Sequence, residues 1–302
     1  AFEPSWLAHQ LNMLYLPLWA GAALSGSTVH RLRWGPLTFE RLLLAGGLLA
    51  LLLSVSRVGL LAPLLCFLLL AAWGAGWLAL RLQRRWMSAS RVTGWRRAWL
   101  GGLAWLGIGV GFILLALGLF LAAAFALSKF DPRMATMFDL TALRKGGLTT
   151  YANQLVFAER VLFWEAGWSV FNDYPWLGVG LGNSGFFFPQ KLSAFSLGLP
   201  EVRTLLFAWD SIPNSKNLWV RLLAETGVVG AAFFFSWLYL TAVSAAGLVS
   251  RKGLGRAALA RALGFAGLFA LTGLISEGFS VDTYALPYFW TTFALAAAAA
   301  CA

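Results

Sequence analysis

Long apolar runs separated by short, arginine-bearing loops are the feature that most restricts the fold of this chain. Four runs, at residues 36–56, 58–80, 99–127 and 228–249, are each about 20 residues long or longer, which is sufficient to cross the hydrocarbon core of a bilayer. Of the 302 residues, 60% are hydrophobic and only 12% are charged, and soluble domains are far more polar. The sequence therefore predicts an all-α polytopic membrane protein.

Three shorter or weaker apolar segments raise the expected number of transmembrane helices to about six to seven. They lie at residues 6–29, at residues 262–276 and beyond residue 284. The expected organisation is transmembrane helices, then a large extracytoplasmic helical loop, then a surface helix with further transmembrane helices, over residues 1–127, 128–216 and 217–302. The chain opens without methionine and stops inside an apolar run, so we expect it to be trimmed from a longer protein, at its N-terminus in particular.

Basic residues are distributed as a topology signal. The loops at residues 30–41, 81–98 and 250–261 contain more than half of the 23 lysines and arginines. The positive-inside rule therefore places these loops in the cytoplasm. The polar insertion 128–215 and the bend 277–284 then fall on the outer face. A net charge of +11 distributed in this way indicates topology and not a nucleic-acid surface.

The residue types that commonly bind metal ions are scarce and scattered. The chain has two cysteines, Cys66 and Cys301, and two histidines, His9 and His30. These positions match no zinc-site spacing, and no D-x-D motif or similar acidic cluster marks a site for a hard cation. We expect neither a metal nor another cofactor.

Gly178, Gly180 and Gly182 alternate in the insertion. A dinucleotide-binding fingerprint needs a preceding strand and a different spacing, so a nucleotide site is not expected here. Alternating glycines are instead typical of a tight turn or of a close approach by another backbone. The sequence predicts a structural loop of this kind.

The segment 211–230 is expected to begin a helix at the membrane surface. Ser215 is the natural N-cap residue by type, and Asn217, Arg221 and Glu225 recur every four residues, which places them on one polar face. Lys216 stands at the start of this helix, where the helix dipole attracts anions. We expect this end of the helix to bind a phosphate-linked substrate.

Further cations are expected on the same side of the membrane. Arg57 interrupts two apolar runs, and Arg160 and Arg203 lie in the insertion among tryptophans and phenylalanines. Guanidinium groups bind phosphate oxygens through paired hydrogen bonds, so the set suits a lipid diphosphate or an anionic sugar. The alternative is that these are solvated charges, with Arg57 a snorkelling residue.

Four motifs together resemble the O-antigen ligase and O-antigen polymerase superfamily of bacterial inner-membrane glycosyltransferases. They are S-R at Ser56, R-x-x-F-W-E-A-G from Arg160, Y-P-W-L-G-V-G-L-G-N from Tyr174, and K-N-L-W-V-R-L-L-A-E-T-G-V-V-G from Lys216. The resemblance extends over residues 41–295. It departs from the family at Lys216, where ligases have a histidine before the asparagine.

The resemblance implies a GT-C-like membrane glycosyltransferase with a large periplasmic loop, located in the cytoplasmic (inner) membrane. Its partners would be membrane lipids, an undecaprenyl-diphosphate-linked glycan and a glycan or glycolipid acceptor, which for a lipopolysaccharide ligase is a lipid A core sugar. Transfer would be inverting, without metal. By position, Arg57 and Arg160 would hold the diphosphate, and Lys216 would complete the catalytic set.

The role of Lys216 follows from its chemistry. A lysine is ordinarily protonated at neutral pH, so a cation that stabilises the leaving diphosphate is favoured over a general base. A base would then be a carboxylate, with Glu165, Asp210 and Asp282 as alternatives. The remaining expected substrate-binding residues are Arg203, Arg221, Asn217, Glu165 and Asp210.

Two alternatives to the ligase function stay open at this level. A polymerase would use a second lipid-linked repeat as acceptor. A non-catalytic binder of lipid-linked glycans, or a transport component, would account for the missing histidine.

Overall fold

The protein is described from a computed structural model. The structure describes residues 4–26, 33–35, 37–56, 58–72, 74, 95–154, 157–192, 200–203, 207, 212–282 and 284–302.

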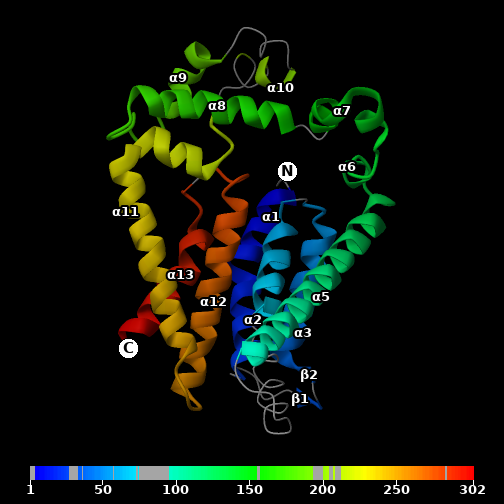
Figure 1. Cartoon of the computed structure of the whole chain (residues 1–302). Coiled ribbons are helices and arrows are strands. Elements are labelled where there is room, and N and C mark those ends of the chain that lie inside the picture. Colours follow the sequence, from blue (N-terminus) through cyan, green and yellow to red (C-terminus); the bar gives the residue numbers. More distant parts are fainter. Residues whose placement is uncertain are drawn as a thin grey trace.

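A bundle of apolar helices forms the body of the molecule (Figure 1). Within the described ranges, helices occur at every apolar run that the sequence marks, and the only strands there are β1 (Arg33–Trp34) and β2 (Leu37–Thr38), which pair antiparallel. The all-α membrane class is thus confirmed. The bundle elements are α1 (Pro4–Gln10), the π-helix η1 (Leu11–Tyr15), α2 (Leu16–Ser25), α3 (Phe39–Leu53), α11 (Leu218–Val249), α12 (Arg256–Glu277) and α13 (Pro287–Cys301).

Three helices in the described part of the chain are long and apolar enough to cross a membrane, over Gly109–Ser128, Leu218–Val249 and Arg256–Glu277. A shorter apolar helix, Leu61–Ala72, lies within the expected third span. The expected total of about six to seven spans stays a prediction.

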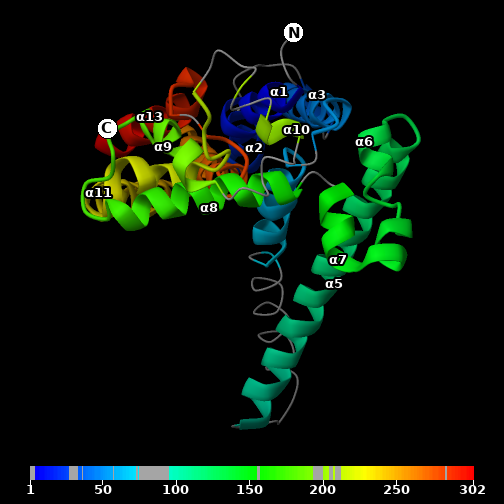
Figure 2. The same ribbon diagram turned by 90° about the horizontal axis from the view of Figure 1, so that it is seen from above.

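The helix α5 (Trp95–Ser128) leans away from the other helices (Figure 2). Among its described side chains, Ala124 and Phe120 near the C-terminal end of α5 enter an apolar cluster with Leu11 and Leu51. Most of the described leucines along α5 are exposed, as suits a surface in contact with lipid.

Close packing of α2 on α12 holds the centre of the bundle together. A Cβ atom added at Gly21 would meet the carbonyl oxygen of Ala262 at 2.1 Å, so the two backbones approach within the space that only glycine leaves. Small residues at helix interfaces permit such an approach in membranes, where close packing replaces the hydrophobic effect as the driving force. Ala266 lies at the same contact.

The polar insertion forms a helical layer across one end of the bundle, opposite the β1–β2 hairpin (Figure 1). Its own apolar core joins α8 to α9, α10 and the start of α11 through Phe163, Ala166, Val170, Phe188, Val202 and Ala224. The helices of the layer are α6 (Pro132–Ala135), α7 (Thr141–Gln154), α8 (Phe157–Asp173), α9 (Ser184–Lys191) and α10 (Pro200–Arg203).

Gly227 divides α11 into a short helix beneath α8 and a long helix that descends along one side of the bundle (Figure 1). Its backbone has φ 62° and ψ −167°, a combination that glycine adopts without steric cost. The glycine loop after α8 docks on this break: the amides of Val179 and Gly180 donate to the carbonyls of Ala224 and Glu225, at 3.0 and 2.9 Å.

The predicted close approach of backbones is confirmed at Gly178, and its counterpart on α11 is a second glycine, Gly227. A Cβ atom at Gly178 would lie 2.3 Å from the carbonyl carbon of Glu225, and one at Gly227 would lie 2.3 Å from that of Trp176. The amide of Val228 in turn donates to Pro175 at 2.8 Å. The break in α11 is therefore held by main-chain contacts from both sides.

Gly21→Ala should destabilise the bundle, because the new methyl group overlaps the backbone of α12. We expect a loss of about 1–3 kcal/mol, the range for overpacking a tight contact. Gly46→Ala is the matched control, since Gly46 also lies in a helix but a Cβ atom added there would have nothing within 4 Å. Thermal unfolding in detergent measures both; equal melting temperatures would contradict the close packing.

Gly227→Ala should weaken the contacts between α11 and the loop that contains Gly178, Gly180 and Gly182. Gly182→Ala is the control for backbone strain alone, because Gly182 has φ 81° but nothing within 4 Å of an added Cβ. A left-handed residue other than glycine costs about 1–2 kcal/mol, so Gly182→Ala should lose that much and Gly227→Ala clearly more. Limited proteolysis of the helical layer formed by α6 to α10 measures the difference. Equal resistance of this layer to cleavage in the two variants would contradict the prediction.

Candidate functional site

The short N-terminal part of α11 begins two residues later than the sequence indicated. Asn217, not Ser215, is the N-cap: its Oδ1 accepts the amides of Trp219 and Val220, at 2.9 and 3.2 Å. Ser215 is fully buried and donates its hydroxyl to the carbonyl of Asn217 at 2.8 Å. The predicted cap was wrong because the chain turns once more, at Lys216, before it becomes helical.

Lys216 has a left-handed backbone, with φ 48°. Its amide donates to Oδ1 of Asn214 at 3.1 Å, which stabilises a turn that a residue with a Cβ atom otherwise disfavours. Its ammonium group lies 5.5 Å from the centre of the Phe163 ring on α8, within the range of a cation–π interaction. The turn thus directs the lysine side chain towards the helix that carries Arg160.

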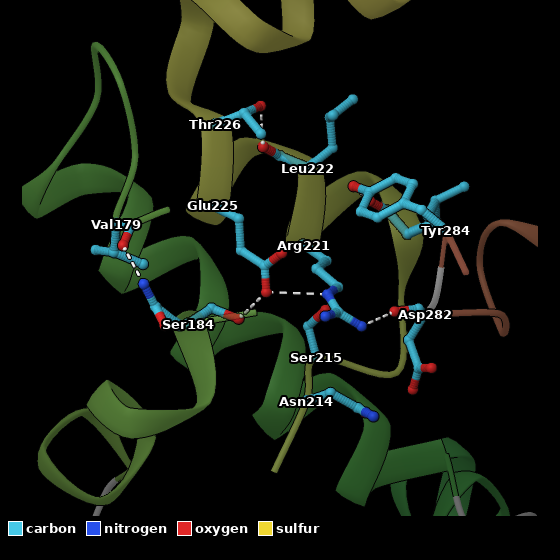
Figure 3. Close-up of polar contacts among 12 residues, drawn as sticks. Val179, Ser184, Asn214, Ser215, Arg221, Leu222, Glu225, Thr226, Asp282 and Tyr284 are labelled. Carbon is cyan, nitrogen blue, oxygen red and sulfur yellow. Dashed lines mark hydrogen bonds and ion pairs between the residues drawn. The ribbon is translucent and has the colours of Figure 1, made fainter. Parts of the chain in front are cut away.

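Arg221 and Glu225 form an ion pair on the polar face that the sequence predicted. Arg221 Nε lies 2.9 Å from Glu225 Oε1, and the Ser184 hydroxyl donates to the same oxygen at 2.8 Å. Glu225 is 2% exposed, and these contacts compensate the cost of burying its polar side chain. Figure 3 shows Arg221 between Glu225 on one side and Asp282 on the other.

The turn between α12 and α13 receives both arginines. Arg160 Nη1 donates to the Ser280 hydroxyl at 2.8 Å, and Arg221 donates to the carbonyl oxygen of Asp282. The guanidinium of Arg221 also lies 5.9 Å from the centre of the Tyr284 ring. Residues far apart in the chain, on α8, α11 and this turn, therefore meet at one place.

The carboxyl group of Asp282 lies in the combined field of these cations. Burial raises the pKa of Asp282 above its usual value, whereas Arg221, Lys216 and Arg160, in that order, pull the pKa down. Burial dominates, so this carboxylate holds a proton more readily than an exposed aspartate does. Burial also raises the pKa of the neighbouring Tyr284, and the charge of Glu225 adds to that shift.

The structure brings together part of the expected site. Arg160, Lys216, Arg221 and the cap residue Asn217 converge on the α12–α13 turn. Glu165 is exposed on α8, and Arg203 is exposed at the end of α10. Arg57 and Asp210 lie outside the described residues.

Sequence reasoning missed Ser280, Ser184 and Tyr284. Each is an ordinary polar residue in a loop or at a helix end, and only its neighbours in space distinguish it. The polar bend at residues 277–284, which interrupts two apolar helices, was the available signal.

The geometry favours the binding of an anion next to a group that can accept a proton. Three cations around one largely buried carboxylate suit a diphosphate, since cations compensate the charge that develops on a leaving group. The described residues contain no cluster of three or more histidine, cysteine or acidic side chains that could hold a metal ion.

Comparison with known proteins agrees with the motifs quoted above. No curated protein and no solved structure matches the chain significantly. The family model described as O-antigen ligase matches residues 42–235, a range that includes α8, the glycine loop and the N-terminal half of α11. Because this match extends over more than half of the chain, the protein belongs to the O-antigen ligase family, whose members have membrane glycosyltransferase activity of the ligase or polymerase type.

Proposed function

We propose that this protein transfers a glycan from an undecaprenyl-diphosphate carrier to a glycan or glycolipid acceptor, at the outer face of the bacterial cytoplasmic membrane. The observation that carries the proposal is the convergence of Arg160, Lys216 and Arg221 on the turn that contains Asp282. This cluster lies where the helical insertion covers the end of the apolar bundle (Figure 1). A carrier embedded in the membrane can present its diphosphate at that level.

The cations act on the diphosphate. Arg160 and Arg221 have planar guanidinium groups that can each engage two phosphate oxygens, and Lys216 contributes a third charge. As the acceptor hydroxyl attacks the anomeric carbon, the bond from this carbon to the phosphate oxygen breaks and its electrons stay on the diphosphate. The three cations stabilise this growing charge, in the place that a metal ion takes in other enzymes.

Asp282 is the carboxylate best placed to take the proton of the acceptor hydroxyl. Attack from the face opposite the diphosphate inverts the anomeric configuration and leaves the proton on Asp282. The raised pKa of Asp282 suits a proton acceptor, because a base works best when its pKa approaches the ambient pH. Glu165 is exposed and lies outside this cluster of contacts, so Asp282 takes precedence over it.

Substitutions at Lys216 test the activity and the role of the lysine together. Purified protein should transfer a lipid-linked glycan to an acceptor, Lys216→Arg should retain part of the rate, and Lys216→Ala should lose about 10²–10³-fold, as for the loss of one charge-stabilising donor. Relative to the unmodified protein at the same pH, Lys216→His should be more active at pH 5.5 than at pH 8, because a histidine is a cation only below its pKa of about 6.5.

Lys191→Ala is the matched control, since Lys191 pairs with Asp173 away from the turn. This variant should transfer at the rate of the unmodified protein. A Lys216→His variant whose rate, relative to that of the unmodified protein at the same pH, instead rises with pH would assign a base to this position. Absence of transfer by the unmodified protein with every donor and acceptor would favour the non-catalytic binder.

Asp282→Asn should remove the acid limb of the pH–rate profile. The carboxylate accepts a proton only when ionised, so the rate should fall as the pH drops through its raised pKa, at a higher pH than an ordinary aspartate would set. The amide cannot titrate, and the variant should be slow and independent of pH over the same range.

Stability gives a second measure of the same shift. A carboxyl group with a higher pKa in the folded state stabilises the protein at low pH, and this contribution is lost as the pH rises through the folded pKa. The melting temperature of Asp282→Asn relative to the unmodified protein should therefore increase with pH. The opposite trend would show that the cations, not burial, dominate at this site.

A further inference from the structure

A second polar cluster lies buried inside the helix bundle, outside the site described above. Nδ1 of His9 lies 2.5 Å from Oε2 of Glu277, and Nδ2 of Asn12 donates to Oε1 of the same carboxylate, also at 2.5 Å. His9, Asn12 and Glu277 are 6%, 4% and 1% exposed. Burying a carboxylate among apolar helices is costly unless it is well hydrogen-bonded, so both oxygens of Glu277 have partners.

Glu277 is the last residue of α12, and the α12–α13 turn begins directly after it. Its carbonyl oxygen accepts the amides of Ser280 and Val281, each at 2.7 Å, which closes the turn. Two residues of this turn receive the arginines of the site, Ser280 through its hydroxyl and Asp282 through its carbonyl. Glu277 therefore links the buried cluster, through its side chain, to the turn that receives the arginines, through its main-chain carbonyl.

The same turn also holds the start of α11. The amide of Leu218, the first residue of that helix, donates to the carbonyl of Gly278 at 2.7 Å. Lys216 and the N-cap Asn217 immediately precede this contact. A displacement of the turn would thus move the lysine together with the two arginines.

Asn12 connects the cluster to a further segment. Besides Glu277, its side-chain amide donates to the carbonyl of Gly59 at 2.6 Å, two residues after Arg57. A side-chain amide has two N–H groups, so Asn12 can satisfy both acceptors at once. It lies in the π-helix η1, a backbone irregularity that is frequent at functional positions.

We propose that Glu277 is a positioning residue, which through His9 and Asn12 fixes the α12–α13 turn against the segment that follows Arg57. The pair of contacts from Asn12 sets the distance between two segments that the bundle alone would leave adjustable. The turn then presents Ser280 and the Asp282 carbonyl to the arginines, and Gly278 to α11. As a role in donor binding, the proposal rests on the proposed function.

Steady-state transfer by Glu277→Gln, in the full chain reconstituted in nanodiscs, tests this role. The KM for the lipid-linked donor should rise about tenfold, the factor expected from weakening one buried charged hydrogen bond. The KM for the acceptor should stay within about twofold, and displacement of Asp282, which acts on the acceptor hydroxyl only in the transition state, should lower kcat instead. The rate of transfer by Glu277→Asp should be lower than that of Glu277→Gln, because the shorter aspartate side chain cannot reach both His9 and Asn12.

Glu40→Gln is the matched control. Glu40 is also 1% exposed, but it lies in the first turn of α3, next to the β1–β2 hairpin at the opposite end of the bundle. The Glu40→Gln substitution should lower the melting temperature about as much as Glu277→Gln does. It should leave the KM values for donor and acceptor unchanged. An unchanged donor KM in Glu277→Gln, with transfer by the unmodified protein intact, would overturn the inference while leaving the proposed function in place.

A distance measurement tests the positioning without any need for turnover. Spin labels at Leu61→Cys and Phe279→Cys, in a background with Cys66→Ser and Cys301→Ser, report the separation between the two segments. The distance distribution should broaden in Glu277→Gln and in the milder Asn12→Ala, and not in Glu40→Gln. An unchanged distribution in Asn12→Ala would refute the positioning role even if the Glu277 variants fail to fold.

Discussion

The break of α11 at Gly227 is the constraint on which the arrangement of the site depends. A straight helix from Leu218 to Val249 would carry its polar first turns out of the bundle and away from the α12–α13 turn. The break lets those turns lie beneath α8, so Lys216, Arg221 and Glu225 meet residues of three other elements. The break in α11 is stable because the loop after α8 supplies main-chain donors and acceptors to the amides and carbonyls around it.

The cations of the site have aromatic rings as well as polar groups for neighbours. Arg160, Lys216 and Arg221 act on Asp282 from α8 and α11, while Phe163 and Tyr284 place aromatic rings against two of these cations. Aromatic faces lower the number of water molecules around a cation without removing its charge. Charges held in this way interact more strongly with an anionic ligand than charges in open solvent, because the local dielectric constant is lower.

Glu277, His9 and Asn12 extend this arrangement into the bundle. They lie among helices that also pack through close apolar contacts, such as the Gly21–Ala262 packing of α2 on α12. Dispersion contacts between apolar helices specify their spacing but only weakly their axial register, whereas a short hydrogen bond fixes two particular atoms. The hydrogen bonds of this polar cluster therefore fix the axial position of the α12–α13 turn relative to the helices of the bundle.

Much of this protein follows from its sequence, and the reason is the period and length of its patterns. Apolar runs long enough to cross a bilayer must be helical, since backbone groups have no other partners in lipid, and helices occur at each run within the described ranges. The four-residue spacing of Asn217, Arg221 and Glu225 likewise required one polar face, and the alternating glycines indicated a close backbone contact without identifying its partner.

Tertiary structure decided the rest. Asn217 replaced Ser215 as the N-cap because Lys216 adopts a left-handed turn, and Asp282 became the central carboxylate because α12 ends beside α8 and α11. No local pattern distinguishes Asp282 from the other acidic residues, since its character comes from burial and from cations more than 60 residues away in the chain.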